Sequence, residues 1–140
     1  NVRTEAKDLR MEEEVVVTIA GFMNATGGTL LLGVADDGAI VGLAADYAVT
    51  PGTGRDGFEL WLRQLLGNRL GRASTADAAV AFEEIYGRDV CRVDVAPADA
   101  PVFVRSTGGA HAADFHLRVG NATRRLLTDE ALEYTRRRWP

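Results

Sequence analysis

The sequence predicts an α+β domain, a mixed α/β two-layer arrangement in which a mixed β-sheet with hairpins packs against about three helices. Three observations support this prediction. Apolar residues recur at helical spacing between Met11 and Asn24, and an unbroken apolar run follows at 29–34. Two segments, 79–86 and 89–96, flank a short turn and are typical of a β-hairpin. A chain of 140 residues is long enough for one core, so we expect one domain over 1–140.

The first part of the chain predicts one helix and one hairpin. Residues 1–10 are polar, and we expect them to be irregular. The run at 29–34 lacks polar alternation, which predicts a strand buried on both faces. The Asp37-Gly38 pair favours a tight turn, after which 39–43 should return as a second strand. The apolar stripe of the helix comprises Met11, Val15, Ile19, Phe22 and Met23.

The second part of the chain predicts a loop, a helix, further strands and a final helix. Glycines and Pro51 indicate a loop over 44–57, and apolar spacing predicts a helix over 58–70. After the hairpin, 102–105 and 114–119 should form short strands. Thr128 is the expected cap of the last helix, because acidic residues follow it in the first turn.

Composition places the chain among ordinary globular proteins. Apolar residues make up 46% and charged residues 26% of the sequence. No apolar run reaches the ~18–20 residues of a membrane span, so we expect no membrane partner and a cytoplasmic location. Cys91 is the one cysteine, which excludes a disulfide within the chain. It alternates in phase with Val93 and Val95, so we interpret it as a small core residue.

The net charge of −4 hides an asymmetry along the chain. Residues 1–100 carry 9 basic and 16 acidic side chains, whereas 101–140 carry 7 basic and 4 acidic ones. A polyanion can therefore find a positive surface in the C-terminal part. For Arg136 to Arg138, a position at a helix C-terminus is an equally good explanation. The basic residues of this part are all arginines: Arg105, Arg118, Arg124, Arg125, Arg136, Arg137 and Arg138.

Three groups of residues, in this order, resemble one protein family. They are Phe22-Met-Asn24 with Gly27-Gly28 and Gly33-Val34-Ala-Asp36, then Pro101-Val-Phe-Val-Arg105, then Arg118-Val-Gly120-Asn-Ala-Thr123. Together they are similar to the bacterial Schlafen AlbA-type domain, and the resemblance covers most of the chain. It implies a Schlafen AlbA-like fold and a DNA- or RNA-binding module within a larger regulator or defence protein. The other domains of that parent chain would then be partners.

The resemblance also implies an alternative, a divalent-metal nuclease. In nuclease members of the family, a Glu-x4-Glu-Phe-Lys motif and an aspartate after the Gly-Val strand are held to bind the metal. Asp36 matches that aspartate, with Asp37 beside it, so these are the implied catalytic residues, and Asp36 is the implied ligand of Mg²⁺ or Mn²⁺. Glu5 lies only 19 residues before Asn24, closer than the family spacing. We therefore expect the motif upstream of residue 1 and the chain to be a fragment truncated at its N-terminal edge.

The turn after the first helix is a candidate phosphate site. Asn24 can donate hydrogen bonds to a ligand there, and the backbone N–H groups of Gly27 and Gly28 can face a phosphate. The alternative is structural: Asn24 ends the helix, and the glycines supply positive φ. The sequence favours this structural interpretation.

The segment around Arg118 is the second candidate. Alternation on the strand places Phe115, Leu117 and Val119 inward, so that His116 and Arg118 share the outer face. With the residues that follow, this face can grip phosphates through arginine forks and a hydroxyl. An ordinary surface ion pair with Asp114 is the alternative. The nucleic-acid-binding candidates here are His116, Arg118, Thr123, Arg124 and Arg125.

Three functions therefore stay open: nucleic-acid binding, metal-dependent nuclease activity, and a structural or homodimerisation role through an exposed sheet edge. An ATPase is excluded for this segment, because Lys7 is the single lysine and no Walker motif is present. Residues 52–57 match a dinucleotide-binding glycine pattern but follow no hydrophobic strand, so no organic cofactor is predicted.

Overall fold

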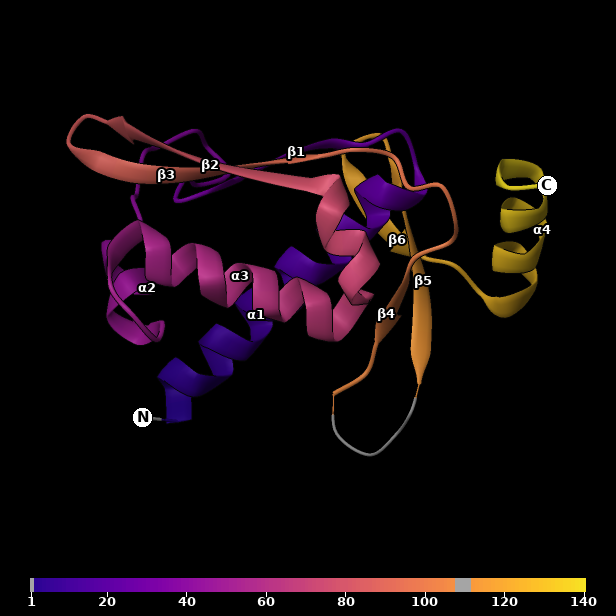
Figure 1. Ribbon diagram of the computed structural model, residues 1–140, viewed down its shortest axis with the longest axis horizontal. Coiled ribbons are helices and arrows are strands. Elements are labelled where there is room, and N and C mark those ends of the chain that lie inside the picture. The colour runs from indigo at the N-terminus through magenta and orange to yellow at the C-terminus, as the bar shows by residue number, and fades with distance from the viewer. Residues whose placement is uncertain (1, 108–111) are drawn as a thin grey trace.

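The computed structural model describes residues 2–107 and 112–140, and the side chains from residue 10 onwards within these ranges. It confirms the α+β class, with antiparallel sheets packed against helices (Figure 1). The elements are α1 (Val2–Asn24), β1 (Gly28–Leu32), α2 (Ala44–Val49), α3 (Gly54–Leu70), the 3₁₀ helix η1 (Arg72–Asp77), β2 (Ala78–Ile85), β3 (Arg88–Val95), β4 (Phe103–Arg105), β5 (Ala113–Val119), β6 (Ala122–Arg125) and α4 (Thr128–Arg138).

The described strands form two three-stranded sheets rather than the single mixed sheet expected from the sequence. The first has the order β1-β3-β2, and the second has the order β4-β5-β6. All of these pairings are antiparallel. In the first sheet, Gly28 of β1 and Ala78 of β2 both lie opposite Val95 of the central strand. β1 is therefore a sheet edge, which matters for the site below.

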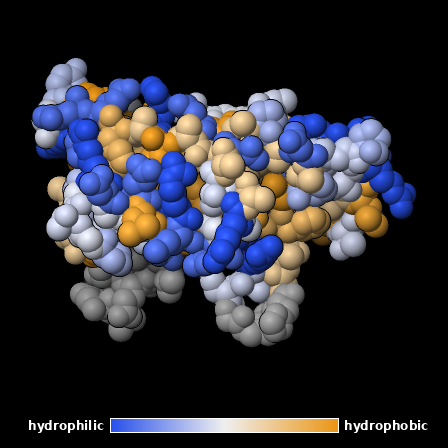
Figure 2. Space-filling view, in the orientation of Figure 1, coloured by the Kyte–Doolittle hydropathy of each residue, from blue (hydrophilic) through white to orange (hydrophobic). Residues whose placement is uncertain are grey.

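The core lies between the first sheet and the helices α1 and α3, which cross beneath it in Figure 1. Phe58 is its aromatic centre, with ring centroids 5.2 Å from Trp61 and 6.0 Å from Tyr47. The face shown in Figure 2 is largely hydrophilic, with apolar side chains in separate patches. The largest fully buried side chains are Phe58, Ile19, Met23, Leu43, Leu62, Leu66, Val16, Val93, Asn24 and Cys91.

The first helix is longer than predicted. α1 begins at Val2, whereas 1–10 were expected to be irregular. A polar composition does not prevent helix formation where the residues are good helix formers, and Arg, Glu, Ala, Lys and Leu all occur there. The predicted stripe is confirmed, since Val15, Ile19, Phe22 and Met23 are all buried.

The prediction that the strand after the Gly-Gly turn is buried on both faces was wrong. Exposure alternates along β1, and Leu31 is 46% exposed. An antiparallel sheet covered by helices on one face leaves the other face to solvent, whatever the apolar content of the strand. On that outer face, the hydroxyl of Thr29 donates to the carboxylate of Asp94 at 2.9 Å.

Residues 39–43 do not form the predicted returning strand. One isolated bridge links Val34 to Ile40. The backbone N–H groups of Val41 and Gly42 both donate to the carbonyl of Gly33, at 2.9 and 2.8 Å, which closes a compact loop. β1 instead pairs with β3, a strand that lies about sixty residues later in the chain.

Two further boundaries differ from the prediction. The expected loop over 44–57 contains α2, and α3 already begins at Gly54. Thr128 is the first residue of α4 rather than its cap, because Leu127 precedes the helix and donates its N–H to Glu130 Oε1 at 2.9 Å. Helix ends shift by a residue or so with the definition used, so the last difference is small.

Three side chains of the last segment fasten it to the rest of the fold, two of them to the end of α1. Tyr134 donates its hydroxyl hydrogen to the carbonyl of Asn24, and Arg138 donates to the carbonyl of Ala25 at 3.2 Å. Trp139 donates from its indole nitrogen to Ala98 at 3.0 Å. In Figure 1, α4 stands at the end of the molecule beyond the second sheet. No helix in the described ranges has the length and apolar character needed to cross a membrane.

Candidate nucleic-acid interface

A groove of about 420 Å³ lies between α1 and the edge strand β1. Glu14, Thr18 and Phe22 line it from successive turns of α1, because residues four apart share a helix face. The groove thus brings together Asp36 and Arg118, which come from motifs far apart in the sequence. Its full lining is Met11, Glu14, Val15, Thr18, Phe22, Thr29, Leu30, Leu31, Leu32, Val34, Asp36, Arg118 and Asn121.

Arg118 is held in place by contacts from two sides. Its Cζ lies 5.1 Å from the centroid of the Phe22 ring, a cation–π distance. Its Nη1 donates to Thr123 Oγ1 at 3.1 Å, and its Nε donates to the Gly120 carbonyl at 3.3 Å. Thr123 in turn packs closely on α1 at Gly21, since a Cβ added to that glycine would lie 2.9 Å from the methyl group of Thr123. Among described residues, Nη2 of Arg118 has no hydrogen-bond partner, so it can meet a ligand.

Arg124 and Arg125 follow on β6 and are both exposed. They lie opposite Leu117 and His116 in the ladder. Arg125 approaches the carboxylate of Asp114 at 4.0 Å, with both side chains more than half exposed. An exposed pair at this distance is weak, so the charge of Arg125 stays available to a polyanion.

His116 differs from its predicted place on a solvent-facing surface. Both faces of β5 are partly covered: His116 and Arg118 are half-buried, while Val119, predicted to point inward, is 49% exposed. Burial lowers the pKa of His116, against the opposing effects of Asp114 and Glu13. Its Nδ1 is buried and has no hydrogen-bond partner among the described residues. His116 is therefore neutral near pH 7 and adds no positive charge for a phosphate.

Asn24 holds elements together instead of facing a ligand. Its side chain is fully buried. Its Nδ2 donates to the carbonyls of Val102 and His116, both at 2.8 Å, and its Oδ1 accepts the N–H of Val102 at 2.9 Å. The residue therefore joins the end of α1 to the second sheet and to the segment before it, with both amide hydrogens in use.

The Gly27-Gly28 turn is likewise committed to packing. Gly27 has φ of +81°, and its N–H donates to the carbonyl of Phe22 at 2.8 Å. A Cβ at Gly28 would lie 2.4 Å from the Phe22 ring, so only glycine lets that ring sit on the turn. The turn thus positions Phe22, and through it Arg118.

The two aspartates have different environments. Asp36 lines the groove, whereas the carboxylate of Asp37 accepts the N–H of Ala39 at 2.9 Å and stabilises the turn. Among side chains of 10–107 and 112–140, no group of three or more His, Cys, Asp or Glu residues is arranged to hold a metal ion. Asp36 and Glu14 alone do not meet the ligand number of Mg²⁺ or Mn²⁺, so no metal-dependent step follows from the described residues.

Comparison with known proteins identifies the family of this chain. A model of the family described as Schlafen, AlbA_2 matches residues 3–127. The chain belongs to the Schlafen AlbA_2 family. The match spans the α1–β1 groove and the β5–β6 hairpin together. No curated protein matches the sequence.

Among solved structures, this Schlafen AlbA_2 chain is similar to the DIP2311 protein from Corynebacterium diphtheriae. The TM-score is 0.61 at 24% sequence identity, and the match covers 92% of this chain. It covers 20% of that protein, so the chain spans about a fifth of its length. At this identity the likeness shows the fold alone.

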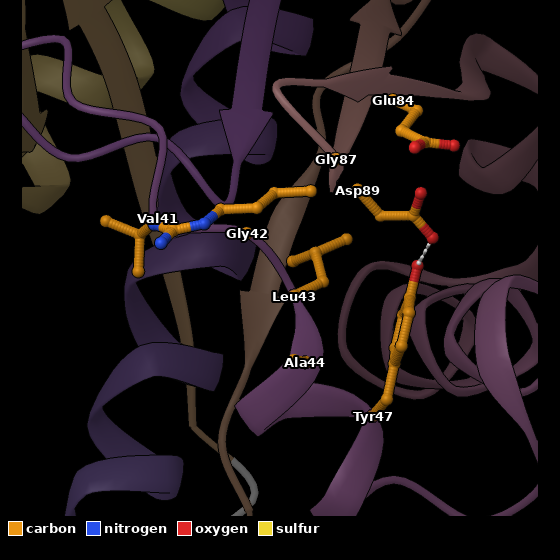
Figure 3. A pocket seen from close by; sticks show the side chains of 9 residues that line it. Val41, Gly42, Leu43, Ala44, Tyr47, Glu84, Gly87 and Asp89 are labelled. Atoms are coloured by element: carbon orange, nitrogen blue, oxygen red, sulfur yellow. Dashed lines mark hydrogen bonds between the residues drawn. The ribbon is translucent and has the colours of Figure 1, made fainter.

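A second polar cluster of this Schlafen AlbA_2 domain was not predicted from the sequence. Tyr47 donates to Asp89 at 2.7 Å (Figure 3). Arg55 donates to the same carboxylate through two nitrogens, at 2.7 and 3.1 Å. The hydrogen bonds from Arg55, and to a lesser extent from Tyr47, lower the pKa of the Asp89 carboxyl. Burial and the neighbouring Asp89 raise the pKa of the Tyr47 hydroxyl. Glu14 was also missed, although its spacing of four from Thr18 and eight from Phe22 indicated a shared helix face.

Proposed function

We propose that this domain binds nucleic acid through the sugar–phosphate backbone, with the β5–β6 hairpin and the adjoining α1–β1 groove as its contact surface. Membership of the Schlafen AlbA_2 family and the arginines of the hairpin both support this proposal. The observation that carries it is Arg118, whose guanidinium is fixed over Phe22 at the groove and keeps one nitrogen free.

Phosphate contacts explain the residue types at this surface. A guanidinium offers paired N–H donors that match two phosphate oxygens, and a guanidinium already held in one rotamer loses little entropy on binding. Arg124 and Arg125 add exposed charge immediately along the chain. His116, Asn24, Gly27 and Gly28 act indirectly in this proposal, because their polar groups are buried or used within the fold.

The contact surface favours backbone contact over base reading. The described aromatic residues near the hairpin pack on one another: Phe115 lies 5.5 Å from Phe103 and 5.9 Å from Tyr134, between ring centroids. Phe115 is buried and the Tyr134 hydroxyl is bonded to the Asn24 carbonyl, so Phe103, 42% exposed, is the single ring of this group of three that is open to a nucleobase. We therefore expect little sequence preference and strong dependence on salt.

The test is fluorescence anisotropy with labelled single-stranded RNA and duplex DNA at low salt. The double variant Arg124→Ala/Arg125→Ala should bind about tenfold more weakly than the wild type. Arg72→Ala is the control for the loss of a positive charge elsewhere, because Arg72 is exposed but lies neither in the groove nor on the hairpin. Equal losses in both variants, or no binding by the wild type to either nucleic acid, would contradict the proposal.

A nuclease is the second candidate, and one observation favours it: Asp36 and Glu14 line the same groove as Arg118. The described carboxylates are too few for a metal site, so this activity needs further ligands beyond them. Mn²⁺-dependent shortening of the labelled RNA that EDTA and Asp36→Asn both abolish would support it. RNA that stays intact with Mn²⁺ would leave the domain as a binding module.

A further inference from the structure

The turn between β2 and β3 carries an unexpected residue. Tyr86 and Gly87 form this two-residue turn, with φ of +51° and +74°. Asn, Asp and Gly are the usual residues for such a turn, since a bulky side chain in the left-handed region is unfavourable. Tyr86 is the one described non-glycine residue with positive φ, and its side chain is 91% exposed. Neither the turn nor the core explains a tyrosine here.

A pocket of about 550 Å³ lies directly beside this turn (Figure 3). Its floor is apolar, formed by the buried Leu43 and by Ala44, with Tyr47 as one wall. The carboxylates of Glu84 and Asp89 stand on one side, as potential acceptors for a hydroxyl hydrogen. Tyr86 is not among the residues that line it, so the ring does not fill the pocket of its own chain.

The charges around the turn are only partly paired. Arg55 neutralises Asp89, and Arg92 neutralises Glu83. Glu84 lies directly opposite Asp89 in the ladder, and Arg55 attracts both carboxylates, but Glu84 forms no ion pair within 4.0 Å with a described side chain. Arg88 likewise forms no ion pair there, and its Nη1 donates to the carbonyl of Ile40 at 2.9 Å.

These features fit a protein partner better than a nucleic acid. One unpaired carboxylate and one unpaired guanidinium give the turn no net positive charge, which disfavours a polyanion. A surface that carries a protruding aromatic side chain, a pocket of sufficient size and one charge of each sign is complementary to itself. Tyrosines in such positions are frequent anchors of protein interfaces.

We propose that the β2–β3 turn is a self-association surface on which two copies of this chain meet about a two-fold axis. Tyr86 of each copy enters the pocket of the other, where its hydroxyl donates to a carboxylate. Glu84 of each copy pairs with Arg88 of the other. In a two-fold contact the pairing of residue i with residue j is repeated as j with i, so the Glu84–Arg88 contact occurs twice. The contact is small, so we expect a dissociation constant of about 10 µM or weaker. The surface is separate from the proposed nucleic-acid interface, and its failure would leave that proposal intact.

The test is sedimentation equilibrium of the domain at concentrations up to about 0.5 mM. The wild type should dimerise reversibly. Tyr86→Asn should be monomeric throughout, with a melting temperature equal to or above that of the wild type, because asparagine tolerates positive φ. A wild type that stays monomeric, or a dimer unchanged by Tyr86→Asn, would overturn the proposal. If the wild type is monomeric and Tyr86→Asn also lowers RNA affinity, the proposal is overturned and Tyr86 is a nucleic-acid contact instead.

Charge reversal tests the reciprocal geometry. Glu84→Arg and Arg88→Glu should each weaken self-association at least tenfold, because both contacts become repulsive. An equimolar mixture of these two variants should form heterodimers, and the double variant should dimerise again, since each restores opposite charges at both contacts. Single variants that lose association without recovery in the mixture or in the double variant would contradict the two-fold arrangement.

Discussion

The guanidinium of Arg118 lies over the ring of Phe22, with Cζ 5.1 Å from the ring centroid. Phe22 belongs to the helix that ends at Asn24, and its ring also packs on the Gly-Gly turn. One aromatic side chain therefore connects the two motifs that are farthest apart in the sequence. This contact explains why a helix end, a glycine pair and a distant arginine occur together in one domain.

Phe22→Leu should weaken nucleic-acid binding although it removes no charge. Leucine keeps the apolar contact with the core but offers no π face, so Arg118 becomes mobile and loses more entropy on binding. We expect about a threefold loss of RNA affinity by anisotropy. Phe103→Leu, which changes an exposed phenylalanine paired with Phe115, is the matched control. Equal affinities of the Phe22→Leu variant and the wild type would show that the ring does not position Arg118.

Asn24→Ala should destabilise the fold strongly. It leaves three buried backbone groups without partners, the N–H and carbonyl of Val102 and the carbonyl of His116. Each such group costs on the order of 1 kcal/mol, so the free energy of unfolding should fall by about 2–4 kcal/mol. Urea denaturation measures this, with the exposed Asn68→Ala as control. A loss below 1 kcal/mol would mean that water replaces these hydrogen bonds at little cost.

The contacts of Asn24 also show where sequence reasoning reaches its limit. The helical stripe that ends at Asn24 was predicted correctly, as was the 79–96 hairpin, because both depend on local periodicity. The partners of the Asn24 amide lie 78 and 92 residues away, and no local pattern encodes such pairings. The sequence therefore favoured a structural role for Asn24 without showing what it holds.

The failed strand at 39–43 has the same cause. Asp37-Gly38 does form a turn, but the strand that pairs with β1 is β3. The sequence identified the turn residues from their backbone preference, whereas the choice of strand partner depends on the whole sheet. For the site, the sequence singled out Arg118 and Asp36 separately, and only the fold places them in one groove.

Two glycine substitutions should have opposite effects on stability. Gly28→Ala places a Cβ 2.4 Å from the Phe22 ring and should lower the free energy of unfolding by about 2 kcal/mol or more. Gly67→Ala, within α3, meets nothing closer than 3.9 Å and should raise it by about 0.5–1 kcal/mol. Thermal and urea unfolding give both values. Similar changes for the two variants would contradict the packing of Phe22 on the turn.

Stability should fall as the pH drops below about 6.5, in part through His116. Burial lowers the pKa of His116 in the folded state, so the unfolded chain takes up a proton first. The neutral form stabilises the fold above the unfolded pKa, and this contribution is lost as the pH falls through the folded pKa. Asp114 and Glu13 oppose the shift, whereas Arg125 reinforces it. His116→Gln should flatten the pH dependence of urea unfolding, and an NMR titration should give a pKa below 6.5.

The most direct test of phosphate-backbone binding is the salt dependence of RNA affinity for the wild type and Arg118→Ala, measured by fluorescence anisotropy. If Arg118, Arg124 and Arg125 each neutralise one phosphate, log K should fall with log salt at a slope of about −2 for single-stranded RNA. Arg118→Ala should reduce the magnitude of this slope by about 0.7. A slope that Arg118→Ala leaves unchanged, or binding that does not depend on salt, would contradict the account.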